Sequence, residues 1–462
     1  MYGYGYRYSA KPSVFAFNPL TDIAGLSLYL NKNTNVNTKI AADFVAANSE
    51  YLSSASIDFD KSTSFSIGGW FYDNGVNFNR FGKWLNTGNQ RSFHMNGSLF
   101  YVSRDGTSAT TVSVNAGTIA PNQWNFLVCV FDYENGLIKV SKNNEAFTTA
   151  VQTGCFDSST EDFHFGKINA SSYYDGKIDS PFFYDKALSL AEVTALYNLG
   201  NGTSYPNLTT AQKVDLVSWW DLNEESGTRN DAHGTNNLTE NNTVSYSLGK
   251  VQDTSTVGER VWNWIDQSPN AYIFSNDTVT DQPLLESNDI VFDGVDDSLE
   301  KTIANVYSGD SSGIIFFSGY FDSSAANYII ASADSSATTS FLGFGLLPAG
   351  EFFVQARTGG VTDTITSTAT ILNGAFYYGY IKSNGTSYEF NVNGSVSTPL
   401  IVGGTNRGHF FADIGLRDNL SLSSLLYSTP IYSPAKVNKI IYSNDYTIDT
   451  APILNFMSNP AN

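Results

Sequence analysis

Short apolar stretches separated by polar turn residues recur along most of the chain. The segments 65–73 (FSIGGWFYD) and 92–103 (SFHMNGSLFYVS) alternate apolar and polar side chains or run apolar. Successive side chains of a strand point to opposite faces, so such patterns are typical of sheet segments. The segment 122–144 has the same character on both sides of Asn135 and Gly136, which predicts a hairpin with its turn at that pair. The chain is therefore predicted to be all-β.

The segment 189–198 has the spacing of a helix instead. Ser189 is a suitable N-cap, Glu192 follows at the third helical position, and Val193, Leu196 and Tyr197 lie on one side. We expect a short helix at this point of the chain.

The second half of the chain repeats the landmarks of the first half in the same order. Four pairs of segments correspond: 290–300 with 42–53, 313–322 with 65–73, 375–395 with 123–144, and 421–443 with 176–198. A shared order is harder to obtain by chance than a shared composition, so the chain is predicted to contain two copies of one module.

Four of these landmarks resemble a known fold family. They are FDGVDDSLE at 292–300, FSIGGWFY at 65–72, WNFLVCVFD at 124–132, and DGKIDSPFFYDKALSLAEVTALYN at 175–198. They are similar to the laminin-G-like, concanavalin-type jelly rolls of bacterial surface proteins and of tailed-phage virion structural proteins. The resemblance implies two concanavalin-like (laminin-G-like) jelly-roll β-sandwich domains. It says little about function, because one fold serves many functions.

Two opening phrases of the modules are displaced from their usual places in such proteins. The phrase at 216–251 follows the closing helix of the first module. The opening strand at 18–31, which in such proteins usually leads directly into a segment like 261–300, is more than two hundred residues away from it. We expect a permuted module at 37–252, inserted into a second module formed by 13–36 and 253–450. A tyrosine-rich arm at 1–12 and a C-terminal tail at 451–462 complete this division. The alternative is two sequential modules split near residue 205.

The charge balance narrows the classes of partner. The chain has 25 basic and 44 acidic side chains, a net charge of −19, which argues against a surface that follows nucleic-acid phosphates. It has no run of 18 apolar residues, and residues 1–12 lack the apolar core of a signal peptide. We therefore expect neither membrane insertion nor export, and synthesis in a host cytoplasm. Cys129 and Cys155 are expected to be free buried thiols, with a disulfide as the alternative.

The residues that usually carry hydrolytic chemistry are scattered. His94, His164, His233 and His409 lie in different landmarks and have no paired serine or cysteine motif. Glu224 and Glu225 are adjacent, so on a strand they would point to opposite faces and could not act on one bond. The chain is therefore expected not to be an enzyme, and no cofactor is expected apart from a candidate calcium ion.

Two groups of residues are candidates for binding. The tryptophans Trp219, Trp220, Trp262 and Trp264 could form a platform for glycans, although paired tryptophans in strands usually pack in the core. Asp293, Asp296 and Asp297, in a glycine-containing turn, could hold calcium. Solvated aspartates in a surface turn explain the second group equally well.

The N-terminal arm is a candidate for attachment to a particle. Tyr2, Tyr4, Tyr6 and Tyr8 alternate with small residues and with Arg7, a pattern that could extend along the edge or groove of a partner. A disordered terminus is the plain alternative.

The resemblance and the arm together favour a bacteriophage virion structural protein displayed on the particle surface. It would be a capsid decoration or head fibre, or a tail fibre, with other virion proteins (major capsid or tail proteins) as partners. Host or environmental glycans and a second copy of the chain are further candidate partners, and neither nucleic acid nor a membrane is expected. The alternative is a bacterial surface lectin or adhesin module.

Overall fold

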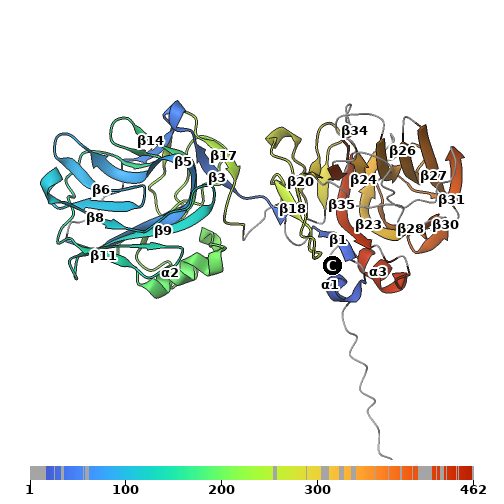
Figure 1. Ribbon diagram of the computed structural model, residues 1–462, viewed down its shortest axis with the longest axis horizontal. Coiled ribbons are helices and arrows are strands. Elements are labelled where there is room, and N and C mark those ends of the chain that lie inside the picture. The colour runs from blue at the N-terminus through green and yellow to red at the C-terminus, as the bar shows by residue number, and fades with distance from the viewer. Residues whose placement is uncertain are drawn as a thin grey trace, which may run out of the picture. The chain divides into compact units, whose positions relative to one another are not determined.

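The computed structural model of the chain is almost entirely β-structure, as the sequence pattern predicted (Figure 1). It describes residues 17–459 apart from 25, 33–35, 56, 58–61, 253–256, 288, 303–311, 322–326, 334–339, 359–360, 373, 385–387, 398, 404–418, 423, 427–430, 433, 444 and 446. No helix in these ranges is both long and apolar enough to cross a bilayer.

The chain divides into two compact units. One is a continuous segment, Lys39–Ser255, which we call the continuous unit. The other combines Met1–Thr38 with Thr256–Asn462, and we call it the split unit. Each unit has its own hydrophobic core between two layers of strands.

The continuous unit is a two-layered β-sandwich. The strands of its first layer are β11 (Thr148–Val151), β10 (Leu137–Lys142), β9 (Trp124–Asp132), β5 (Phe65–Leu85), β14 (Ser172–Tyr184), β3 (Ile40–Phe44) and β17 (Ser245–Leu248), with β15 (Leu216–Trp219) and β13 (Lys167–Ile168) also paired to β14. The strands of its second layer are β16 (Thr239–Asn241), β4 (Tyr51–Ser54), β12 (Phe163–Phe165), the second half of β5, β6 (Gln90–Asn96), β7 (Leu99–Ser103) and β8 (Thr111–Asn115).

Strand β5 belongs to both layers. Residues 65–72 pair with β9, whereas residues 79–85 pair with β6. The aromatic side chains Phe65, Phe71 and Phe81 are fully buried between the layers. One continuous strand therefore links the two sheets and fixes their relative position.

A charged cluster is buried on β5, near the point where the strand passes between layers. Asp73 and Arg80 form an ion pair and are 1% and 0% exposed. The Tyr174 hydroxyl donates to Asp73 Oδ1 at 2.9 Å, and burial raises the pKa of Tyr174 well above its usual value. Buried ions are costly unless they are paired in this way, so we assign the cluster a structural role.

Helix α2 (Leu190–Tyr197) covers the outer face of the first layer. Its Val193 and Leu196 are buried against an aromatic cluster that includes Phe126 and Phe182. Ser189 and Glu192 form the capping box that the sequence predicted. The predicted hairpin is also confirmed, because β9 and β10 pair as antiparallel neighbours.

The split unit is a second two-layered β-sandwich. Its first sheet contains β20 (Leu284–Leu285), β21 (Ile290–Phe292), β35 (Ala435–Ser443), β23 (Gly313–Phe321), β28 (Phe376–Ser383), β29 (Tyr388–Val392) and β30 (Ser395–Ser397), with β1 (Leu26–Asn31) paired to β35. Its second sheet contains β2 (Val36–Asn37), β18 (Asn263–Ile265), β19 (Ile273–Ser275), β22 (Leu299–Thr302), β32 (Asn419–Leu422), β24 (Asn327–Ala333), β25 (Ser340–Leu346), β26 (Glu351–Thr358), β27 (Val361–Thr370) and β31 (Pro399–Gly403). A separate pair is formed by β33 (Ser424–Leu425) and β34 (Ile431–Tyr432).

Two helices pack on the first sheet of the split unit. Helix α3 (Thr450–Met457) buries Ile453 and Met457 in a cluster with Phe316, next to the short helix α1 (Pro19–Asp22). The segment 451–462, expected as a tail, is therefore helical up to residue 457, because its apolar side chains cover the sheet.

Several strand pairings join segments that are far apart in the sequence, and the insertion of one module into the other stays a prediction. Strand β1 pairs with β35, which also pairs with β21, so segments from both ends of the chain share a sheet. Strand β15 pairs with β14, which pairs with β3 in the continuous unit. Two sequential modules split near residue 205 would not require the first of these pairings.

Both cysteines are buried and unbonded in the continuous unit, as expected. Burial raises the pKa of Cys129 far above its usual value and that of Cys155 to about 12. Neither thiol is therefore ionised at neutral pH, which fits a packing role.

Candidate functional site

The outer face of the second layer of the continuous unit carries a group of aromatic and polar side chains. In β6, Phe93 and Met95 point into the core, so His94, which lies between them, points to the opposite face. In β7, Phe100 and Val102 are in the core, which places Tyr101 on the same outer face.

The strand register brings these side chains together. His94 lies directly opposite Tyr101, and their rings are stacked with centroids 4.5 Å apart and an interplanar angle of 7°. On its other side His94 lies opposite Gly82, where an added Cβ would come within 2.6 Å of the His94 Cβ. The absence of a side chain at residue 82 therefore makes room for the imidazole.

A β-bulge adds Arg91 to the group. The register pairs Lys83 with Phe93 and Trp84 with Arg91, so Ser92 is an extra residue in β6. In a regular strand, residues 91 and 94 would face opposite sides. The bulge puts Arg91 on the outer face, opposite Trp84, whose ring centroid is 4.2 Å from that of His94.

These side chains line a cavity of about 330 Å³ in the continuous unit. The lining combines aromatic rings, amides, hydroxyls and one guanidinium: Trp84, Asn86, Arg91, His94, Asn96, Tyr101, Ser108, Thr111, Ile168, Asn169 and Ser172. Among the described residues that line it, none is acidic and Arg91 alone is permanently charged.

Hydrogen bonds hold one side of the cavity in place. The Trp84 indole donates to Asn86 Oδ1 at 2.9 Å, and the Asn86 backbone donates to Asn169 Oδ1 at 3.1 Å. The Asn169 backbone in turn donates to the Trp84 carbonyl at 3.0 Å. The guanidinium of Arg91 donates to the Asn86 carbonyl and lies 6.0 Å from the Trp84 ring. The aromatic and cationic groups are therefore positioned before any ligand binds.

His94 is the unusual residue of this cavity. It is 6% exposed, and its Nδ1 is buried without a hydrogen-bond partner in the described part of the chain. Burial lowers the pKa of His94 to about 3, so the imidazole is neutral at physiological pH. A buried polar atom without a partner costs about 1–3 kcal/mol, so it marks a place where a polar ligand group would be favourable.

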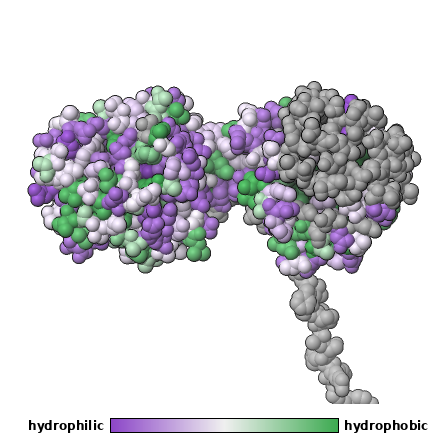
Figure 2. Space-filling view, viewed as in Figure 1, coloured by the Kyte–Doolittle hydropathy of each residue, from purple (hydrophilic) through white to green (hydrophobic). Residues whose placement is uncertain are grey.

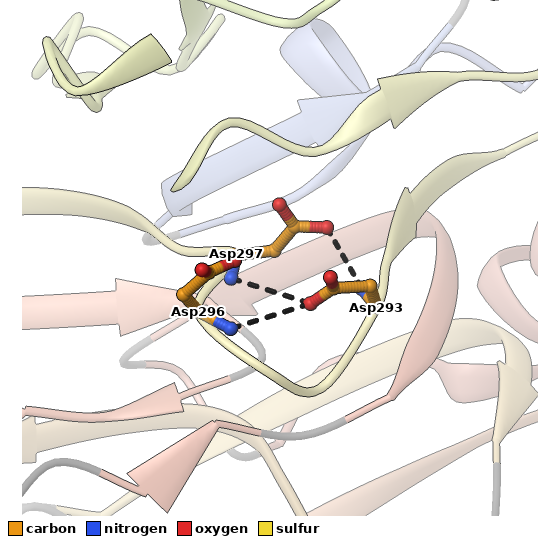
Figure 3. Close-up of side chains that lie close together, drawn as sticks. All are labelled: Asp293, Asp296 and Asp297. Atoms are coloured by element: carbon orange, nitrogen blue, oxygen red, sulfur yellow. Dashed lines mark hydrogen bonds between the residues drawn. The ribbon is translucent and has the colours of Figure 1, made fainter. Parts of the chain in front are cut away.

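The predicted calcium ligands form a second candidate site, in the split unit. Asp293, Asp296 and Asp297 can bring one oxygen each within 4.8 Å of one another (Figure 3). The backbone N–H groups of Asp296 and Asp297 point toward Asp293 Oδ1 at 3.3 and 3.5 Å, and Asp293 N donates to Asp297 Oδ2 at 2.8 Å. Burial raises the pKa of Asp297 to about 6. These bonds also explain the cluster as a hydrogen-bonded turn, so calcium binding stays a prediction.

The four tryptophans considered for glycan binding are core residues. Trp219 and Trp220 are 2% and 0% exposed, and Trp262 and Trp264 are 6% and 0% exposed. Trp219 stacks on Phe182, with centroids 5.3 Å apart. Their large apolar rings gain more from burial than from exposure, so the structure places no sugar platform at these positions.

Two of the remaining histidines and Glu224 contact neighbouring side chains in the described part of the chain. His164 packs edge-on against Tyr51, and the Tyr205 hydroxyl lies 3.2 Å from His233 Nδ1. Glu224 accepts hydrogen bonds from Asn230, whereas His409 lies outside the described residues. The arm residues Tyr2, Tyr4, Tyr6, Arg7 and Tyr8 also lie outside the described residues.

The sequence pattern of one hairpin indicates part of the cavity. In 92–103, a turn at Gly97 and Ser98 makes residues 94 and 101 cross-strand partners on the polar face of the hairpin. The alternation of Phe93, His94 and Met95 predicts that the imidazole lies on the face of the sheet that the two apolar side chains do not occupy. No sequence pattern indicated that Arg91 lies on this face, because its position depends on the bulge at Ser92.

The surface of the continuous unit is mixed in character. Figure 2 shows hydrophilic residues and scattered apolar patches on the visible face of the continuous unit. Unlike those patches, the cavity joins rings with hydrogen-bonding groups, which is typical of a site for a small polar ligand.

Comparisons with known proteins agree with a concanavalin-like fold. Residues 46–194 match the family described as the concanavalin A-like lectin/glucanases superfamily. This segment contains the whole lining of the cavity. No curated protein matches the chain.

Solved structures of similar fold include three from different organisms. The CBM40 domain of a Ruminococcus gnavus IT-sialidase bound to α2,3-sialyllactose is 16% identical, with coverage of 31% of this chain and 82% of the other and a TM-score of 0.28. A putative carbohydrate-binding protein of Bacteroides ovatus is 15% identical, with coverage of 47% and 61% and a TM-score of 0.35. Domains LG4-5 of the mouse laminin α1 chain are 8% identical, with coverage of 87% and 89% and a TM-score of 0.30.

Proposed function

We propose that the chain is a non-catalytic display protein whose continuous unit binds glycans in the cavity around His94. The observation that carries this proposal is the neutral His94 imidazole, whose buried Nδ1 has no hydrogen-bond partner among the described residues and which lies beside two aromatic rings and a set of amides and hydroxyls. A sugar offers apolar C–H faces for the rings and hydroxyl groups for the polar atoms. The match of 46–194 to a superfamily that includes lectins supports the same ligand class.

A glycan array with purified protein and two single variants tests this proposal. Tyr101→Ala removes a partly buried ring of the cavity, and Tyr133→Ala removes an exposed ring elsewhere in the same unit. We expect the wild-type chain and Tyr133→Ala to bind the same glycans and Tyr101→Ala to bind none. Binding that is unaffected by Tyr101→Ala would move the site away from the cavity, and a wild-type chain without any bound glycan would refute the proposal.

We place this binding on the surface of a tailed-phage virion. The support is the resemblance of the landmark segments to virion jelly rolls and the short tyrosine-rich arm before a large body. Quantitative mass spectrometry of purified particles tests the setting. A copy number near that of the major capsid protein would indicate decoration, and a much smaller number would indicate a fibre or tail position.

A bacterial surface lectin or adhesin is the second candidate, because the cavity serves a cell-surface protein equally well. Recovery of the chain in bacterial envelope fractions, together with its absence from purified particles, would favour this candidate over the virion.

A further inference from the structure

The charge of the cavity differs from that of the chain. The chain has a net charge of −19, yet the described lining contains one basic and no acidic side chain. His94 adds no charge at neutral pH, because burial lowers its pKa to about 3. The fixed charge of the lining is therefore positive.

The guanidinium of Arg91 is held in place but retains donors for a ligand. Its described interactions are one hydrogen bond to the Asn86 carbonyl and a contact with the Trp84 ring. A guanidinium has five N–H donors in a rigid fork, so most of them remain available. This fork matches the two oxygens of a carboxylate, and a pre-positioned side chain loses little entropy on binding.

The acidic residue on the loop beside Ser108 is already engaged. Asp105 accepts hydrogen bonds from the hydroxyl groups of Thr107 and Thr110, which lower its pKa to about 2. It is not part of the lining. Its carboxylate is therefore oriented toward its own loop.

We propose that the cavity selects saccharides that carry a carboxylate, with Arg91 binding the carboxylate and His94 binding a hydroxyl of the same sugar. This inference rests on the proposed glycan-binding function and names its ligand class. A neutral imidazole has one donor and one acceptor nitrogen, so it pairs with a hydroxyl without requiring a charge. Arg91 is then the residue that distinguishes acidic from neutral sugars.

Calorimetric titration with matched pairs of oligosaccharides tests this selectivity. Each pair contains a uronic acid and the neutral hexose of the same stereochemistry and linkage. The variants are Arg91→Gln, Arg91→Lys and Arg104→Gln, the last being an exposed control with the same change of net charge.

The wild-type chain should bind the acidic member at least about tenfold more tightly than the neutral one, since a charge-assisted hydrogen bond contributes about 1.5–3 kcal/mol. Arg91→Gln should remove this preference and Arg91→Lys should reduce it, because lysine lacks the fork. Arg104→Gln should change neither affinity by more than about twofold, as expected for a screened surface charge. Thermal unfolding of each variant checks that it is folded.

The outcomes separate the two proposals. Equal affinity for both members of a pair, or equal effects of Arg91→Gln and Arg104→Gln, would overturn the acidic selectivity. If Tyr101→Ala still abolished glycan binding in that case, the glycan site would stand without the selectivity for acidic sugars. Absence of binding to either member and to every glycan of the array would overturn the proposed function itself.

Discussion

Replacement of His94 by phenylalanine tests the energetic cost that we assign to its buried Nδ1. A phenyl ring is expected to keep the stack on Tyr101 and the edge contact with Trp84 that the imidazole makes. The substitution removes a buried nitrogen, Nδ1, for which the described part of the chain offers no hydrogen-bond partner. At pH 7 the free energy of unfolding of the variant should therefore be about 1–2 kcal/mol higher than that of the wild-type chain.

The difference should grow as the pH falls. The folded-state pKa of His94 is about 3, below the ordinary value of about 6.5 in an unfolded chain. Below about pH 6.5 the unfolded wild-type chain binds a proton that the folded chain does not, so the wild type loses stability. Between pH 7 and pH 5 this loss amounts to about 2 kcal/mol, and the variant does not share it.

Denaturant titration at both pH values, followed by hydrogen exchange of peptides from 90–103, measures the continuous unit separately. His164→Phe is the matched control, because burial also lowers the pKa of His164, to about 4, but His164 does not line the cavity. Both variants should show the pH effect, and only His94→Phe should weaken glycan binding, by about tenfold. The assignment of a buried nitrogen without a partner would be refuted if His94→Phe were less stable than the wild-type chain at pH 7 and this difference in stability did not change with pH.

Further predictions concern the rest of the molecule. Asp73→Asn should destabilise the continuous unit by about 3–5 kcal/mol because it leaves the buried Arg80 without its anionic partner, whereas Glu145→Gln, at a side chain that is 60% exposed in its ion pair with Lys142, should cost less than about 1 kcal/mol in the same unfolding experiment. Asp297→Asn should stabilise the split unit by roughly 1 kcal/mol at pH 7, after allowance for solvent screening, and by nothing near pH 4, because a raised carboxyl pKa makes the folded state more stable as the pH falls through about 6. Purified protein should release no reducing sugar from capsule or cell-wall polysaccharide, and measurable turnover would contradict a non-catalytic role. Removal of residues 1–12 should leave the thermal unfolding of both units unchanged and prevent incorporation into particles; truncated protein at the wild-type copy number would place the anchor on a sandwich.

Local pattern was sufficient for the elements themselves. The alternation of apolar side chains predicted the strands, the Asn135–Gly136 pair predicted the hairpin of β9 and β10, and Ser189 with Glu192 predicted the start of α2. Each of these features depends on residues close together in the chain, where the spacing of side chains and the capping of backbone groups decide the structure. The same alternation places His94 and Tyr101 on one face of a hairpin.

The composition of the candidate site depended on register and on packing between distant segments. The tryptophans that a sequence suggests for sugar binding are buried, because their rings fill the cores of the two sandwiches. Arg91 reaches the outer face only because Ser92 forms a bulge opposite β5, and His94 fits there only because Gly82 is its cross-strand neighbour. By itself, the sequence determined an all-β chain with a polar hairpin face. Only the tertiary structure decided which residues share that face, because a one-residue shift in pairing turns a side chain to the other side of the sheet.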